Sequence, residues 1–80
     1  MNLTEQIKNI PRGQCVIISP PNVQVMITGV QYIAIERNKT VTLHYVDGSI
    51  EAGKLEIDKI NDETSFFNIV GMIQGQRTNS

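Results

Sequence analysis

The apolar positions of this chain follow a helical period at both ends and a strand period between them. Near the start, Leu3, Ile7 and Ile10 fall on one face of a short helix, which we expect over residues 1–10. The middle of the chain alternates between apolar and polar positions, as half-buried strands do. The pattern therefore predicts a sheet flanked by helices.

The first strands are expected at residues 14–19 and 23–36, separated by a break at Pro20-Pro21. The second run is far longer than an ordinary strand, so we expect a single ribbon with a bend or bulge at Gly29. Its two parities would place Ile33 and Ile35 in the core and leave the alternate residues outside.

A hairpin is expected next, with strands at 40–46 and 49–57. Asp47-Gly48 is typical of a two-residue type I′ turn. The apolar parity of the return strand changes at Gly53, which predicts a β-bulge there.

The last apolar residues return to a helical spacing. Phe66, Ile69, Val70 and Ile73 predict a helix over 64–74, with a strand as the alternative because Gly71 weakens the helix. Residues 75–80 are polar and are expected to fray.

Together these elements predict a single domain over 1–80 of mainly β class. We expect a bent antiparallel sheet or partly closed barrel of four to five strands over 14–60, with short N-terminal and C-terminal helices.

Composition limits the classes of partner and the cellular compartment that we expect. The chain has 80 residues, seven basic and eight acidic side chains, and a net charge of −1. Nucleic-acid binders usually carry a positive excess, so the balance disfavours that class. A lone cysteine, the lack of a signal-peptide pattern and the lack of a long apolar run predict a cytoplasmic protein without a membrane partner.

The sequence offers little for catalysis. His44 and Cys15 are the only residues of their types. A Cys–His pair would need the first and third strands to bring them together, whereas a cysteine among apolar β-branched residues is typically a small core residue. The carboxylates show no catalytic spacing. We therefore expect no catalytic residues, no metal site and no cofactor.

Two family resemblances concern the strand region. The series Gly13-Gln14-x-Val16, Val25-x-Ile27-x-Gly29-Val30 and Val41-x-Leu43-x-Tyr45-x-Asp47-Gly48 resembles Tudor-like and Src-homology-like small β-barrels over residues 12–60. That resemblance implies a non-catalytic barrel that binds peptides, other domains or nucleic acid.

The second resemblance is to Sm-like proteins and covers a quarter of the chain. It rests on Val41, Leu43, Gly48, Gly53, Leu55, Asp58 and Asn61. It implies a ring-forming RNA binder with Asp58 and Asn61 near the nucleotide. The steps between Leu55, Asp58 and Asn61 are each about one residue shorter than in that family.

Three functions follow as hypotheses. The first is a binding module for another protein or for itself, acting as a homo-oligomeric regulator, adaptor or inhibitor through Met26, Val30, Tyr32 and Phe67. The alternative is a nucleic-acid-binding barrel that uses a patch of Arg12, Arg37, Lys39 and Lys54. The third is an oligomer that sequesters a small ligand between subunits. Phages and other mobile elements encode many small proteins of this kind.

Overall fold

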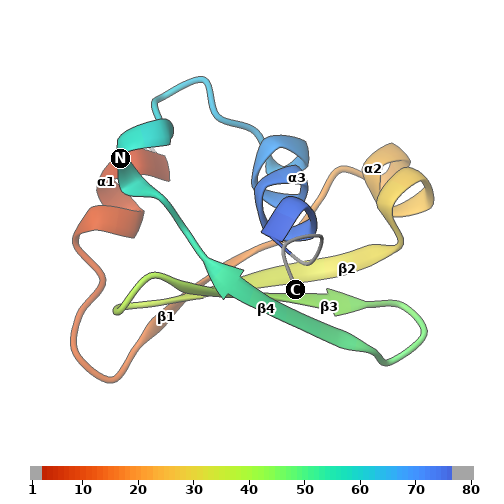
Figure 1. The fold of residues 1–80 in the computed structure, drawn as a ribbon, viewed down its shortest axis with the longest axis horizontal. Coiled ribbons are helices and arrows are strands. Elements are labelled where there is room, and N and C mark those ends of the chain that lie inside the picture. The colour runs from red at the N-terminus through yellow and green to blue at the C-terminus, as the bar shows by residue number, and fades with distance from the viewer. Residues whose placement is uncertain (1–2, 77–80) are drawn as a thin grey trace.

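The computed structural model describes residues 3–76, which form one antiparallel sheet with helices on one side (Figure 1). The described elements are α1 Leu3–Lys8, β1 Cys15–Ile18, α2 Asn22–Thr28, β2 Val30–Glu36, β3 Thr40–Tyr45, β4 Ile50–Lys54, the 3-10 turn η1 Ile57–Lys59, and α3 Phe66–Gln76. The strands lie in the order β1-β2-β3-β4. This confirms the predicted four-stranded antiparallel sheet with short helices at both ends. The sheet does not close, because β1 and β4 are its two edges.

The core lies between the sheet and the helices. Cross-strand pairs of β2 and β3 supply its floor, with Ile33 opposite Leu43 and Ile35 opposite Val41. Each of these side chains is fully buried. The cover comes from Ile7 and Ile10 near the N-terminus and from the α3 residues Phe66, Ile69, Val70 and Ile73. All four predicted core residues of the last helix are therefore confirmed.

The predicted ribbon over 23–36 is wrong in its first half, which is the helix α2. Pro21 holds an extended conformation and accepts the first helical hydrogen bonds, from Gln24 N at 2.9 Å and from Val25 N at 3.3 Å. Gly29 then adopts a left-handed conformation (φ 74°) and donates to Val25 O, which ends the helix. Gly29 is a helix C-cap and not a bend within a strand.

A second correction concerns Val30, which was expected outside the core. The pairing of β2 with β3 shifts between Val30 and Tyr32, so Gln31 is an extra residue on β2. The extra residue changes the parity, and Val30 and Ile33 both face the core. Val30 is consequently 0% exposed.

The turn at Asp47-Gly48 is confirmed, although its type differs from the prediction. Tyr45 N donates to Ser49 O at 2.9 Å, and Gly48 N donates to Tyr45 O at 3.0 Å. Within this turn, Gly48 alone has a positive φ, of 93°. The loop therefore holds three residues and ends on a left-handed glycine, which matches the right-handed twist of the strands it joins.

No bulge occurs at Gly53, contrary to the prediction. Gly53 pairs with Val41 in regular register, and its neighbours pair in step. A Cβ at this position would overlap Gln76 Oε1 and would lie 3.1 Å from Ile73 Cγ2. The glycine lets the C-terminal end of α3 approach β4.

The two terminal helices differ in detail from the expected bounds. In α1, Ile7 is buried as predicted, while the Leu3 side chain lies outside the described residues. The final helix begins after Ser65, whose Oγ and backbone nitrogen exchange hydrogen bonds with Asn68 at 3.3 and 2.9 Å. This reciprocal cap fixes the start of α3. The helix continues through Gln76, and the rest of the expected frayed tail, residues 77–80, is not among the described residues.

Candidate functional site

One face of the sheet carries no described helix, and we call it the open face (Figure 1). Its side chains come from the strand positions that alternate with the core positions. One cross-strand row runs through Ile17, Ala34, Thr42 and Ala52, and the next through Tyr32, His44 and Ile50. These seven residues define the open face. None of these seven carries a carboxylate, an ammonium or a guanidinium group, whereas the next row on the same face includes Glu36 and Lys54.

Two rings stiffen one end of the open face. Tyr32 and His44 stack with their centroids 4.2 Å apart and their planes 11° from parallel. His44 Nε2 also lies 3.0 Å from Thr42 Oγ1, and that hydroxyl donates to Ala34 O at 3.4 Å. His44 Nε2 and Thr42 Oγ1 are therefore engaged within the face, and the two rings pack against each other.

Projections and a hollow lie on the same face. Ile17 is 55% exposed and Ile50 is 63% exposed. Beside them is a hollow of about 630 Å³, lined by Gly13, Gln14, Cys15, Ala34, Glu36, Arg37, Asn38 and Thr42. Small side chains thus leave room next to large ones, as in surfaces that interlock with a partner.

The predicted interaction residues do not form one surface. Tyr32 alone of the four belongs to the open face. Met26 is on α2 and is 87% exposed, Phe67 is on α3 and is 44% exposed, and Val30 is in the core. Sequence reasoning missed Ile17 and Ile50. The signal was available for Ile17, since Val16 and Ile18 share the parity that pairs with the buried Ile35 and Ile33.

The predicted basic residues, in contrast, gather at one end of the sheet. Arg12 precedes β1, Arg37 and Lys39 lie in the turn between β2 and β3, and Lys54 ends β4. Two of these ammonium groups bind backbone carbonyls: Lys39 Nζ donates to Ile7 O at 2.7 Å and Lys54 Nζ to Asn38 O at 3.1 Å. Glu36 lies at the same end, so the positive charge is partly offset.

The two residues considered for catalysis lie apart. Cys15 is exposed, and it lies two strands and about four residues away from His44 on the same face. Strand spacing of ~4.8 Å and a rise of ~3.3 Å per residue put their Cα atoms roughly 16 Å apart. Within residues 3–76, no cluster of three or more histidine, cysteine or acidic side chains is suited to hold a metal ion.

Comparison of the chain with protein-family models, with curated proteins and with solved structures gave no match. What the structure shows of the barrel resemblance is an antiparallel sheet with helices. Across the described part of the chain, no helix is both long and apolar enough to cross a membrane.

Proposed function

We propose that this protein is a non-catalytic protein-binding module that associates with a second copy of itself through the open face. The observation that supports the proposal is the uncovered sheet surface, which holds Ile17, Ile50 and a stacked Tyr32–His44 pair without an ionic side chain among its seven residues. Burying these seven residues removes apolar area from water.

A second copy is the occupant that fits this surface best. The same face offers both projecting isoleucines and a hollow whose lining includes Ala34, so an isoleucine of one copy can enter the hollow of the other. Four strands at ~4.8 Å and rows at ~6.6 Å give a flat area of about 300 Å² per copy. A stable interface buries about 800 Å² per partner, so we expect a weak, concentration-dependent dimer.

The test is sedimentation velocity or light scattering over a concentration series from about 10 μM to 1 mM, the range in which interfaces of this size associate. The expected result is a mass that rises toward the dimer. Ile17→Asp should weaken association at least tenfold, because it places a carboxylate inside the interface. Ile17 is more than half exposed in the single chain, so its replacement should spare the fold.

Val46→Asp is the matched control. Val46 is also an exposed apolar residue, but it lies in the turn after β3 and not among the seven open-face residues. It should leave the association unchanged. A strictly monomeric wild type at 1 mM, or equal effects of the two substitutions, would refute the proposal.

A nucleic-acid partner is the second candidate, favoured by the gathering of Arg12, Arg37 and Lys54 at one end of the sheet. Phosphate contacts by these cations would give an affinity that falls steeply with salt. Fluorescence anisotropy with a labelled single-stranded oligonucleotide at low salt tests this candidate. Binding lost in the double variant Arg12→Glu/Arg37→Glu supports it, and no binding by the wild type excludes it.

A further inference from the structure

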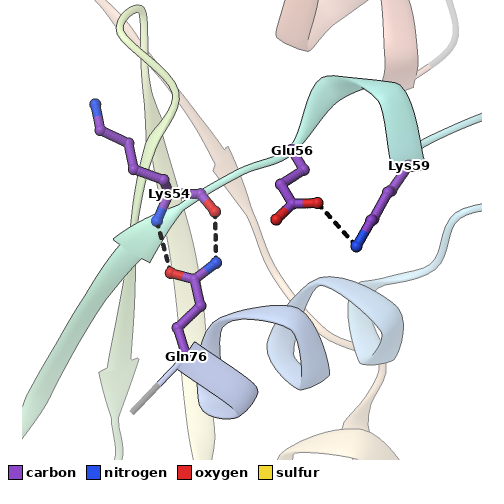
Figure 2. A network of polar contacts seen from close by, with 4 residues as sticks. All are labelled: Lys54, Glu56, Lys59 and Gln76. Carbon is purple, nitrogen blue, oxygen red and sulfur yellow. Dashed lines mark hydrogen bonds and ion pairs between the residues drawn. The ribbon is translucent and has the colours of Figure 1, made fainter. Parts of the chain in front are cut away.

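Within residues 3–76, a side chain closes the outer edge of β4 at one residue, Lys54. Lys54 N donates to Gln76 Oε1 at 2.9 Å, and Gln76 Nε2 donates to Lys54 O at 2.7 Å. Figure 2 shows the two bonds side by side, with the Gln76 amide lying along the strand. One side-chain amide thus meets both backbone groups of one strand residue, as one residue of an added antiparallel strand does.

The hydrogen-bond pattern of β4 explains why Lys54 is open to such a partner. Leu55 N donates to Lys39 O at 2.8 Å, and Tyr45 N donates to Ser49 O at 2.9 Å, so the odd-numbered residues of this segment bond toward β3. The backbone groups of Ile50, Ala52 and Lys54 consequently point away from the sheet. These three residues form the pairing edge of β4.

A small pocket lies directly beside this edge. It holds about 110 Å³ and is lined by Lys54, Glu56, Lys59, Met72 and Gln76. Met72 supplies an apolar wall, and a Lys59–Glu56 ion pair of 2.9 Å closes one side (Figure 2). The volume is suited to one aliphatic side chain of about the size of valine. A strand laid along β4 would direct alternate side chains to this side of the sheet.

We propose that the edge of β4 is a binding site for an extended peptide of another protein, and that Gln76 occupies it as an internal surrogate when no peptide is bound. The peptide pairs its backbone with Ile50, Ala52 and Lys54 and places an aliphatic side chain in the Met72 pocket. Binding releases the Gln76 amide from Lys54. This is recognition by strand addition, in which main-chain bonds give affinity and a pocket gives selectivity. The peptide site uses backbone groups of β4, whereas the open face uses the side chains of Ile50 and Ala52, so the two sites share β4 but not Ile17 or the rest of β1.

The probe is a capped heptapeptide of alternating valine and threonine, with one lysine added for solubility, titrated into the full ¹⁵N-labelled chain. The readout is saturable movement of the Ala52 and Lys54 amide signals. Gln76→Ala removes the competing amide and should tighten binding by about five- to 150-fold, the effect of two hydrogen bonds to a backbone. Gln76→Glu should fall between the wild type and the alanine variant, because a carboxylate accepts from Lys54 N but donates nothing to Lys54 O.

Gln74→Ala is the matched control, since it removes the same side chain two residues earlier, where Gln74 Nε2 donates to Tyr45 Oη. It should not tighten binding. A fully N-methylated peptide, which donates no backbone hydrogen bond, should not bind. Binding should persist in Ile17→Asp, which separates this site from the open face.

Four results would overturn the proposal. They are no saturable shift at Lys54 in any variant at about 1 mM peptide, the weak end of protein–ligand affinity, an equal gain in Gln74→Ala, undiminished binding of the N-methylated peptide, or dimerisation of the double variant Ile17→Asp/Gln76→Ala without peptide. The last result would mean that the edge receives a second copy of the chain.

Discussion

Gly53→Ala tests the packing of α3 against β4 more directly than any other single substitution. Gly53 does not have the left-handed backbone of Gly48, so alanine can adopt its conformation without strain. The added Cβ instead meets the C-terminal end of α3. It overlaps Gln76 Oε1 and lies 3.1 Å from Ile73 Cγ2 and 3.2 Å from Gln76 Cδ.

The expected cost follows from which atoms can move. The Gln76 amide is at the far end of a flexible side chain and can move away from the added Cβ. It then loses both hydrogen bonds to Lys54. Two such bonds contribute about 1–3 kcal/mol to the free energy of unfolding. Alanine restores about 0.5–1 kcal/mol by reducing the freedom of the unfolded chain. We therefore expect a net destabilisation of about 1–2 kcal/mol.

Urea unfolding followed by circular dichroism measures this change. With a slope near 1 kcal/mol/M for so small a domain, the midpoint should fall by about 1–2 M. Gln76→Ala alone should also destabilise the protein. In the double variant the overlap with Gln76 is gone and the contact with Ile73 remains, so adding Gly53→Ala to Gln76→Ala should change the free energy of unfolding by less than about 1 kcal/mol.

The coupling between the two positions decides the outcome. If Gly53→Ala costs as much in the Gln76→Ala background as in the wild type, the two residues are not in contact and the described packing is wrong. If the Cβ added at Gly53 destabilised the protein only through its contact with Ile73, the effects of the two substitutions would likewise be additive.

The remaining predictions concern the core and the turn after β3. Phe66→Ala should lower the free energy of unfolding by about 3–5 kcal/mol in the same urea assay, because Phe66 is buried. Phe67→Ala, on the exposed side of α3, should lower it by less than about 1 kcal/mol. Equal costs would contradict the placement of α3. Gly48→Ala should cost about 1–2 kcal/mol from backbone strain alone, since φ is 93° and no atom lies near the added Cβ; a neutral result would contradict the left-handed turn. The Ser49 hydroxyl and backbone N–H both donate to Asp47 Oδ1 and lower the pKa of that carboxyl from 3.8. The stabilisation is thus present above pH 3.8 and is lost as the pH falls through the lowered pKa, and Asp47→Asn should remove this part of the acid dependence.

The sequence was sufficient for elements whose pattern favours one structure. Leu43 and Val41 alternate with polar residues beside a strong turn. Phe66, Ile69, Val70 and Ile73 follow a helical spacing, which favoured the helix over the alternative strand. For both segments the burial pattern and the local chemistry agree. The structure accordingly reproduces the hairpin and the core face of α3.

The segment 22–28 could not be assigned from its pattern. Val23, Val25 and Ile27 alternate as in a strand, and their β-branched side chains favour one. The helix they form buries none of its residues, so the sequence of this segment has no apolar stripe at helical spacing that would indicate a helix. Gly29 was correctly marked as a special position but served as a helix cap. The bulge at Gln31 then reversed the parity of Val30, and the candidate-site prediction that depended on this parity failed with it.

The same segment explains why the sheet stays open. A barrel of four or five short strands needs one long, bent strand that pairs on both sides of the closure. The predicted ribbon over 23–36 would have supplied it, but α2 takes the first six of those residues, 23–28, and leaves β2 to pair only with β1 and β3. β1, four residues long, and β4 then remain at opposite edges. Within residues 3–76, an open face without a helix and a β4 edge that Gln76 meets at Lys54 both go with this helix. Both proposed binding surfaces therefore depend on the segment whose conformation the sequence pattern predicted wrongly.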